Sequence, residues 1–147
     1  MKMVSVKVVS ASCIDINSRD VHGRTMVYYA SVKKEKTSLV TLIENGADVN
    51  IADNWGWTPL IQAAQMGMVD NCRTLITTPG CLLDYAAIDG RTALMHACEN
   101  GHSEVVQLLL DHGANINIKS THGYTALIAA ANTGRYDICK SLVNWPE

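Results

Sequence analysis

The sequence predicts an all-α solenoid in which four helix-turn-helix repeats stack side by side and are joined by hairpin-like turns. The first observation is a Gly-x-Thr pair that recurs with spacings of 33, 34 and 33 residues, at Gly23, Gly56, Gly90 and Gly123. The second is that each of these threonines is followed by an alanine five residues later and a leucine 17 residues later. A fixed period in this range indicates an array in which each repeat packs only on its neighbours.

The repeat at residues 86–118 is the most regular and shows how each unit folds. A glycine turn leads into an apolar run at 92–98, and a second glycine turn leads into a longer run at 103–110. Each run is too short to form a stable helix alone, so we expect packing between neighbours to stabilise both helices. Gly113 suits the left-handed residue that ends a helix. Leu109 stands at a position that is leucine in all four repeats and is expected in the core.

Aligning the repeats on their Gly-x-Thr pairs gives each residue a position within the repeat, which we call its frame position. On this alignment the whole chain is one domain. A half repeat at 1–17, made of an outer helix and its turn, precedes four repeats at about 18–51, 52–85, 86–118 and 119–147. The half repeat is explained equally well as a terminal cap and as part of a longer array.

The first full repeat departs from the pattern at the turn between its two helices. Lys34 stands where the later repeats have Gly67, Gly101 and Gly134. A lysine adopts the left-handed conformation only at a cost of roughly 1 kcal/mol, so we expect this turn to be the least regular. The basic run around Lys34 is interpreted as a solvated turn.

The second and fourth repeats indicate how the helices begin and where the array stops. Thr58 can cap a helix with its hydroxyl, and Pro59 fits the first helical position, where no backbone donor is needed. One extra residue in the turn at 77–80 explains the single spacing of 34 and lengthens a surface turn without shifting the helices. Trp145 either folds over the exposed edge of the last repeat or precedes a further repeat, and the sequence leaves both alternatives open.

Several stretches resemble the ankyrin repeat, which has a period of 33 residues and the core motif T-P-L-H-x-A. Residues 58–64 read TPLIQAA and 92–97 read TALMHA, while 45–50 and 112–117 resemble the family's later turn with NGADVN and HGANIN. The resemblance covers residues 18 to 145 and its motifs are specific. It implies inner and outer helices joined by hairpin tips, with a protein-binding concave face formed by the tips and inner helices.

One departure from the ankyrin pattern is shared by all four repeats. The histidine of the motif, which in this family forms hydrogen bonds between repeats, is replaced by Tyr28, Ile61, Met95 and Ile128. We therefore expect the same fold, with its repeats held together more by apolar packing than by that polar network.

Composition and charge narrow the class of protein. A chain of 147 residues with 48% apolar residues suits one folded domain. A formal net charge of −2 gives no electrostatic attraction to nucleic acid or an anionic membrane, and no segment has the roughly 18 consecutive apolar residues of a membrane span. Five scattered cysteines predict reduced thiols in an intracellular protein, with the cytoplasm favoured and the nucleus left as an alternative. We expect a monomer.

Motifs for catalysis, cofactors and metals are missing from the sequence. It has no phosphate-binding glycine loop, no H-E-x-x-H motif and no paired CxxC, so it predicts no enzyme, no cofactor and no metal site. His96 and Cys98 resemble a base and a thiol nucleophile, but Cys98 shares its frame position with Ala64 and Ala131. Because such close helix positions also point apart, we interpret Cys98 as a core residue.

The remaining candidate is a binding surface, because stacked repeats form a long concave face. Aromatic residues and arginines on such a face are the types that dominate the energy of protein interfaces. By frame, the predicted partner-binding residues at the tips are Arg24, Asn54, Trp55, Trp57, Asp89, Arg91, His122 and Tyr124, and those on the inner helices are Tyr29, Gln62, Gln65, Met66, His96, Glu99 and Asn100.

Trp55 and Trp57 are the leading candidates on this surface. Residues two apart in an extended tip share a side, so we expect the two rings to lie side by side and exposed. The alternative is that one ring packs over a neighbouring tip, near Arg24 or Arg91, in a cation–π contact.

The sequence thus predicts a protein–protein interaction module that binds a protein partner through its concave face. The alternative is a regulatory or inhibitory subunit, or an adaptor, that acts on an enzyme through the same face. Both functions would use the same residues, so the sequence does not separate them.

Overall fold

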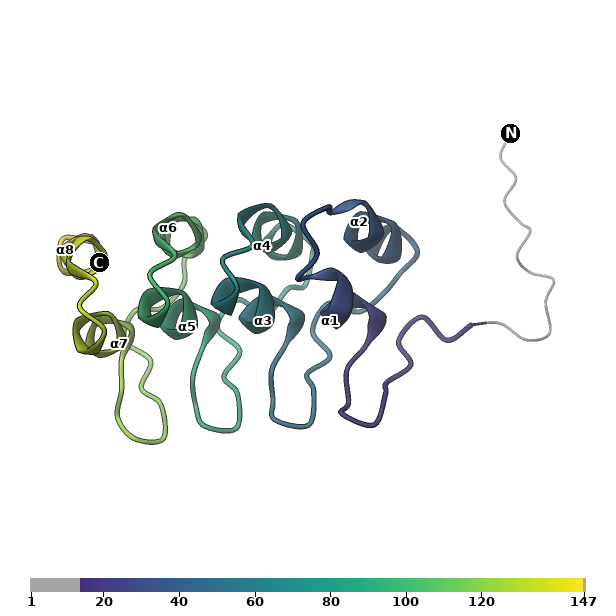
Figure 1. The fold of residues 1–147 in the computed structure, drawn as a ribbon, viewed down its shortest axis with the longest axis horizontal. Helices are drawn as coiled ribbons and strands as arrows, with labels where there is room; N and C mark the ends of the chain where they lie inside the picture. The colour runs from purple at the N-terminus through teal and green to yellow at the C-terminus, as the bar shows by residue number, and fades with distance from the viewer. Residues whose placement is uncertain (1–13, 147) are drawn as a thin grey trace.

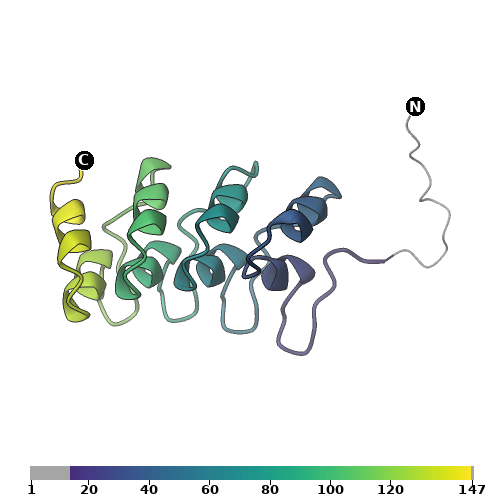
Figure 2. The ribbon, with the colours of Figure 1, turned by 45° about the horizontal axis from the view of Figure 1, so that its top comes forward.

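The structure is a computed structural model that describes residues 14–146. Over that range the chain forms an elongated array of helix pairs without strands (Figure 1 and Figure 2). The odd-numbered helices lie next to the hairpin tips, and the even-numbered helices form the second layer. This arrangement confirms the predicted all-α solenoid. The helices are α1 (Met26–Ala30), α2 (Thr37–Glu44), α3 (Pro59–Gln65), α4 (Val69–Ile76), α5 (Ala93–Glu99), α6 (Ser103–Asp111), α7 (Ala126–Asn132) and α8 (Tyr136–Val143).

A threonine precedes each inner helix and caps it. The side-chain hydroxyl accepts a hydrogen bond from the backbone N–H three residues later, at 3.2 to 3.4 Å, in Thr25, Thr58, Thr92 and Thr125. Each cap satisfies one of the N–H groups that the first helical turn leaves unpaired. Pro59 occupies the first turn of α3, as predicted. The threonine of the Gly-x-Thr pair therefore marks the start of an inner helix.

The core lies between the two helix layers and follows the predicted leucine frame inside the array. Leu75 and Leu109 are fully buried, and Leu142 is 4% exposed. Leu42, the equivalent residue of the first repeat, is only half-buried; its helix α2 stands near one end of the array (Figure 1). The frame therefore predicts burial well in the second, third and fourth repeats.

Lys34, in the turn between α1 and α2, does not adopt the left-handed conformation that the glycines at this position of the later repeats adopt. Every positive φ in the described chain belongs to a glycine, so the expected strain at this lysine is wrong. Instead, α1 ends early and residues 31–36 connect it to α2. The side chain of Asn71 in α4 holds this connection, because its Nδ2 donates to the carbonyl oxygens of Ser31 at 2.9 Å and Lys33 at 2.7 Å. A contact from the next repeat thus takes the place of a turn glycine.

Replacing Asn71 with alanine is expected to lower the free energy of unfolding by roughly 1–3 kcal/mol, because two carbonyl oxygens lose their donor in a largely buried place. Chemical denaturation measures the change. Asn45→Ala is the matched control, because its exposed amide bonds only to Thr41 O of its own helix. Equal effects of the two substitutions would contradict a special role for Asn71.

The hairpin tips join successive repeats and touch one another along the array. The second tip is closed by a hydrogen bond from Asp53 N to Trp57 O at 2.9 Å, and Ile88 N of the third tip donates to Trp55 O at 3.2 Å. Gly56 has a φ of 81°, and a Cβ at this position would lie 2.8 Å from Ile88 N. Glycine is therefore required both by the backbone conformation and by the close approach of the next tip.

The residues that replace the ankyrin histidine differ in what they contribute. Ile61 and Met95 are each 1% exposed, which agrees with the expected apolar packing between repeats. Ile128, in the last repeat, is 44% exposed. Tyr28 instead keeps a polar link between repeats, since its hydroxyl donates to Gln62 Oε1 at 2.8 Å.

The sequence analysis made predictions for both ends of the chain, at Trp145 and at the half repeat 1–17. Trp145 is half-buried and packs against the core. Of the expected half repeat, residues 1–13 lie outside the described residues. Asn17 Oδ1 accepts a hydrogen bond from Asp48 N at 2.8 Å, in the same way that Asn50 Oδ1 accepts one from Leu82 N at 2.9 Å.

Candidate functional site

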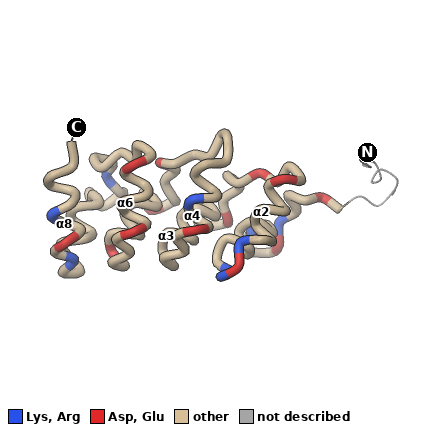
Figure 3. Tube along the Cα trace, turned by 90° about the horizontal axis from the view of Figure 1, so that it is seen from above, with Lys and Arg blue, Asp and Glu red and all other residues tan. Residues whose placement is uncertain are grey.

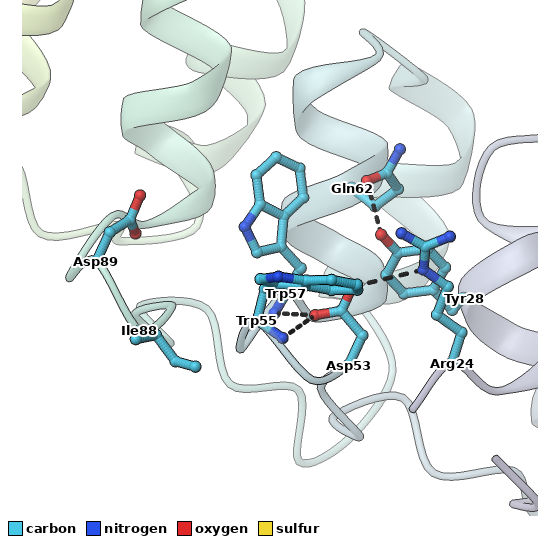
Figure 4. A pocket seen from close by; sticks show the side chains of 8 residues that line it. All are labelled: Arg24, Tyr28, Asp53, Trp55, Trp57, Gln62, Ile88 and Asp89. Atoms are coloured by element: carbon cyan, nitrogen blue, oxygen red, sulfur yellow. Dashed lines mark hydrogen bonds and ion pairs between the residues drawn. The ribbon is translucent and has the colours of Figure 1, made fainter. Parts of the chain in front are cut away.

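A pocket of about 450 Å³ lies where the first three tips meet α1 and α3 (Figure 4). We call it the tryptophan pocket. It opens on the face that the tips and inner helices share, which is the face that the sequence analysis selected. Its lining residues are Arg24, Tyr28, Asp53, Trp55, Trp57, Gln62, Ile88 and Asp89.

Trp55 is the exposed aromatic residue of this pocket, with 52% of its surface accessible. Its ring stacks on His22 of the neighbouring tip with centroids 5.9 Å apart, and the Arg24 guanidinium lies 5.7 Å from its centroid. The backbone beside the ring is fixed by Asp53, whose Oδ1 accepts from both Trp55 N and Trp57 N at 2.9 Å. Trp55 therefore makes the cation–π contact of the alternative interpretation and remains half-exposed.

Arg24 is held in place on three sides. Its guanidinium lies 5.0 Å from the centroid of the Tyr28 ring as well as near Trp55. Its Nε is 3.5 Å from Asp53 Oδ2, and the Asp53 side chain is only 2% exposed. Burial, and then the charge of Asp53, raises the pKa of Tyr28 to about 12, so its hydroxyl stays protonated and donates to Gln62. The polar groups of this wall thus already contact one another in the absence of a ligand.

Trp57 is half-buried whereas Trp55 is exposed, so the prediction that both rings are exposed is wrong for Trp57. Its ring is half-buried against the core and packs on His96 of α5, with centroids 4.6 Å apart and planes 52° apart. The expected alternation requires extended backbone throughout, but the left-handed Gly56 between the two tryptophans turns the chain. Trp57 therefore packs against the core, whereas about half of the Trp55 surface stays exposed.

His96 was predicted to contact a partner, but it is buried and 2% exposed. Neither ring nitrogen has a hydrogen-bond partner in the described chain. Loss of solvation, followed by the nearby charge of Arg91, lowers the pKa of His96 to about 4. The imidazole is therefore neutral at physiological pH. It packs against the Trp57 ring and does not form part of the surface.

A second, smaller pocket of about 260 Å³ continues the same face toward the fourth tip. An ion pair between Arg91 and Glu99, with 2.7 Å between Nη2 and Oε2, stands in its wall. Asp89 lines this pocket and the tryptophan pocket alike, so the two are adjacent parts of one groove. The remaining lining residues are Ser120, His122, Tyr124 and Asn132.

The other predicted contact residues lie outside both pockets. Tyr29 is 43% exposed and Met66 is 54% exposed, and Asn54 and Asn100 are also exposed, while Gln65 is half-buried. The Tyr29 hydroxyl donates to Asp20 Oδ2 at 2.5 Å, which fixes the ring over the first tip. These side chains are accessible on the inner helices and tips but do not converge on a single cavity.

In the tryptophan pocket the sequence analysis missed three lining residues, which are Tyr28, Asp53 and Ile88. Asp53 had a detectable signal, because it shares its frame position with Asp20, and both carboxylates accept hydrogen bonds from backbone N–H groups of their own tips. Tyr28 replaces the motif histidine, and the sequence analysis therefore assigned it to packing between repeats and not to the binding surface. Ile88 had no signal, since it reaches the pocket only through the contact between neighbouring tips.

Within 14–146, no three His, Cys, Asp or Glu side chains converge as a metal site would require, and no helix is both long and apolar enough to cross a membrane. The thiols of Cys72, Cys81, Cys98 and Cys139 are free. Burial raises the pKa of Cys98 to about 12, so this thiol is not a nucleophile at neutral pH, in agreement with its interpretation as a core residue.

Charged side chains of both signs are interspersed along the array, with a local basic run before α2 (Figure 3).

One family model and several known proteins are similar to this chain. The family model for ankyrin repeats (3 copies) matches residues 3–87 and 77–146. The chain is 31% identical over 131 residues to the B-cell lymphoma 3 protein homolog of Mus musculus, covering 84% of this chain and 29% of that protein. It is 32% identical over 131 residues to the putative ankyrin repeat protein FPV223 of Fowlpox virus (strain NVSL), covering 88% of this chain and 91% of that protein.

A third relative is human SH3 and multiple ankyrin repeat domains protein 2, which is 29% identical over 114 residues. The match covers 78% of this chain and 6% of that protein. The chain thus spans less than a third of the mouse and human relatives, although it corresponds to nearly the whole length of the viral one.

Proposed function

The chain belongs to the ankyrin repeat family, and from this premise we propose that its groove of tips and inner helices binds an extended segment of a partner protein. Ankyrin repeats form protein–protein interaction modules, and repeat arrays present a long face of this kind. The observation that carries the proposal is the tryptophan pocket, where a half-exposed indole adjoins polar groups that are already held in place.

The composition of the pocket supports a protein ligand. Tryptophan, tyrosine and arginine are the residue types that dominate binding energy in protein interfaces, and all three line this pocket. Trp55 retains about half of its surface for a ligand, although it stacks on His22. Arg24 is held by Asp53, Tyr28 and Trp55, so little side-chain entropy remains to be lost when a partner binds.

Replacing Trp55 with alanine is expected to weaken binding of the natural partner by about 2 kcal/mol, because it removes the exposed aromatic side of the pocket. The partner is first recovered with the wild-type chain as bait, and its affinity for each variant is then measured by calorimetry. The helical signal should stay unchanged, since the ring faces solvent.

The matched control is Tyr136→Ala, which removes an aromatic side chain that is 73% exposed on α8, outside both pockets. Undiminished binding by the Trp55 variant, or an equal loss in the Tyr136 variant, would place recognition elsewhere on the chain. Trp57 is unsuitable for this test, because its loss would also disturb the core.

A further inference from the structure

The charges in the groove do not balance. Arg24 faces Asp53 at 3.5 Å, and Arg91 faces Glu99 at 2.7 Å, so both arginines of the two pockets already have a carboxylate partner. Asp89 is the third carboxylate in the lining of these pockets and forms no ion pair with any described residue. The groove therefore has one unpaired negative charge, at the place where its two pockets meet.

Asp89 is held in the third tip by its backbone and by one carboxylate oxygen. Its carbonyl oxygen accepts from both the backbone N–H and the hydroxyl of Thr121, each at 2.9 Å. Its Oδ1 accepts from Arg91 N at 3.0 Å. The carboxylate is thus positioned without being neutralised, on the side of the tryptophan pocket opposite Arg24 (Figure 4).

Large apolar surface lies directly beside this charge. Ile88, the preceding residue, is 73% exposed, and Trp55 is 52% exposed. Both line the tryptophan pocket together with Asp89. A ligand that fills this pocket with an apolar side chain would therefore bring its neighbouring residue close to the unpaired carboxylate.

We infer that the occupant of the groove is a basic protein segment, in which a lysine or arginine pairs with Asp89 and an adjacent large apolar side chain enters the tryptophan pocket. This inference rests on the proposed function. Charge complementarity supports it, because an acidic segment would meet Asp89 and find both arginines already paired. A nucleic acid is disfavoured for the same reason, since its phosphates would approach an uncompensated carboxylate.

A library of random heptapeptides displayed on phage provides the test, with the whole chain as bait. Selection is expected to enrich peptides in which a lysine or arginine adjoins an aromatic or large aliphatic residue. A synthetic peptide of that sequence should bind Asp89→Asn roughly three- to fivefold more weakly than the wild type, because an exposed ion pair contributes modestly. Asp111→Asn, which changes an exposed carboxylate on α6, should bind like the wild type.

The peptide itself supplies a second control. When its basic residue is replaced by glutamine, the wild type and the Asp89 variant should bind it equally. Enrichment of acidic or uncharged peptides would overturn the inference, as would equal losses in the Asp89 and Asp111 variants. If Trp55→Ala abolishes binding while Asp89→Asn does not, the groove is the binding face and only the charge preference is wrong. If neither substitution affects binding, the proposed function itself fails.

Discussion

Replacing Leu109 with alanine is expected to lower the free energy of unfolding by roughly 2–5 kcal/mol. Leu109 lies in α6 of the third repeat and is fully buried, with neighbouring repeats on both sides. Alanine would leave a cavity, and the helices around it can close that cavity only in part. Urea denaturation followed by circular dichroism measures the shift. The matched control is Leu82→Ala, because Leu82 is 52% exposed in the turn that follows α4.

The loss at Leu109 should also be local. Stability in a repeat array is approximately a sum of repeat and nearest-neighbour terms, so the third and fourth repeats should lose protection before the first. Hydrogen exchange read by mass spectrometry resolves this order. A denaturation midpoint that does not move would show that the leucine frame is misassigned, and uniform loss of protection would contradict the nearest-neighbour description.

Acidification is expected to destabilise the fold through His96. The unfolded chain takes up a proton at this histidine near its ordinary pKa of 6.5, whereas burial keeps the folded imidazole neutral down to a pKa of about 4. Because the unfolded state binds the proton first, stability is complete above pH 6.5 and falls as the pH drops through this window. The loss should reach roughly 3 kcal/mol near pH 4. Arg91 adds to the lowering, while Asp89 and Glu99 oppose it.

Other groups titrate in the same range, so the test is a comparison between variants. His96→Leu should lose this part of the pH dependence, and its stability at neutral pH should be equal to or higher than that of the wild type, because two unpartnered ring nitrogens disappear. His122→Gln, at an exposed position of the fourth tip, is the control and should keep the wild-type profile. An unchanged profile in the His96 variant would show that this imidazole is not buried in solution.

The groove was predictable in outline because position within the repeat determines which residues reach the tips. Trp55, Asp89 and Tyr124 were placed on the predicted binding face by frame, and each lines a pocket. His96 and Trp57 came from the same frame and proved buried and half-buried. A frame specifies the direction of a Cα–Cβ bond, but it does not specify what a large neighbouring side chain will cover.

The period of the sequence by itself determined the fold of this chain, its inner and outer helices, the capping threonines and most of the core. These features depend on neighbouring residues in the sequence and recur at the same position of each repeat. Each repeat therefore supports the interpretation of the others. Only the tertiary structure decided that Trp57 turns onto His96, that Asn71 supports the turn at Lys34 and that Asp89 lacks a charged partner. Those outcomes depend on side chains of neighbouring repeats that meet in space, and they differ from one repeat to the next.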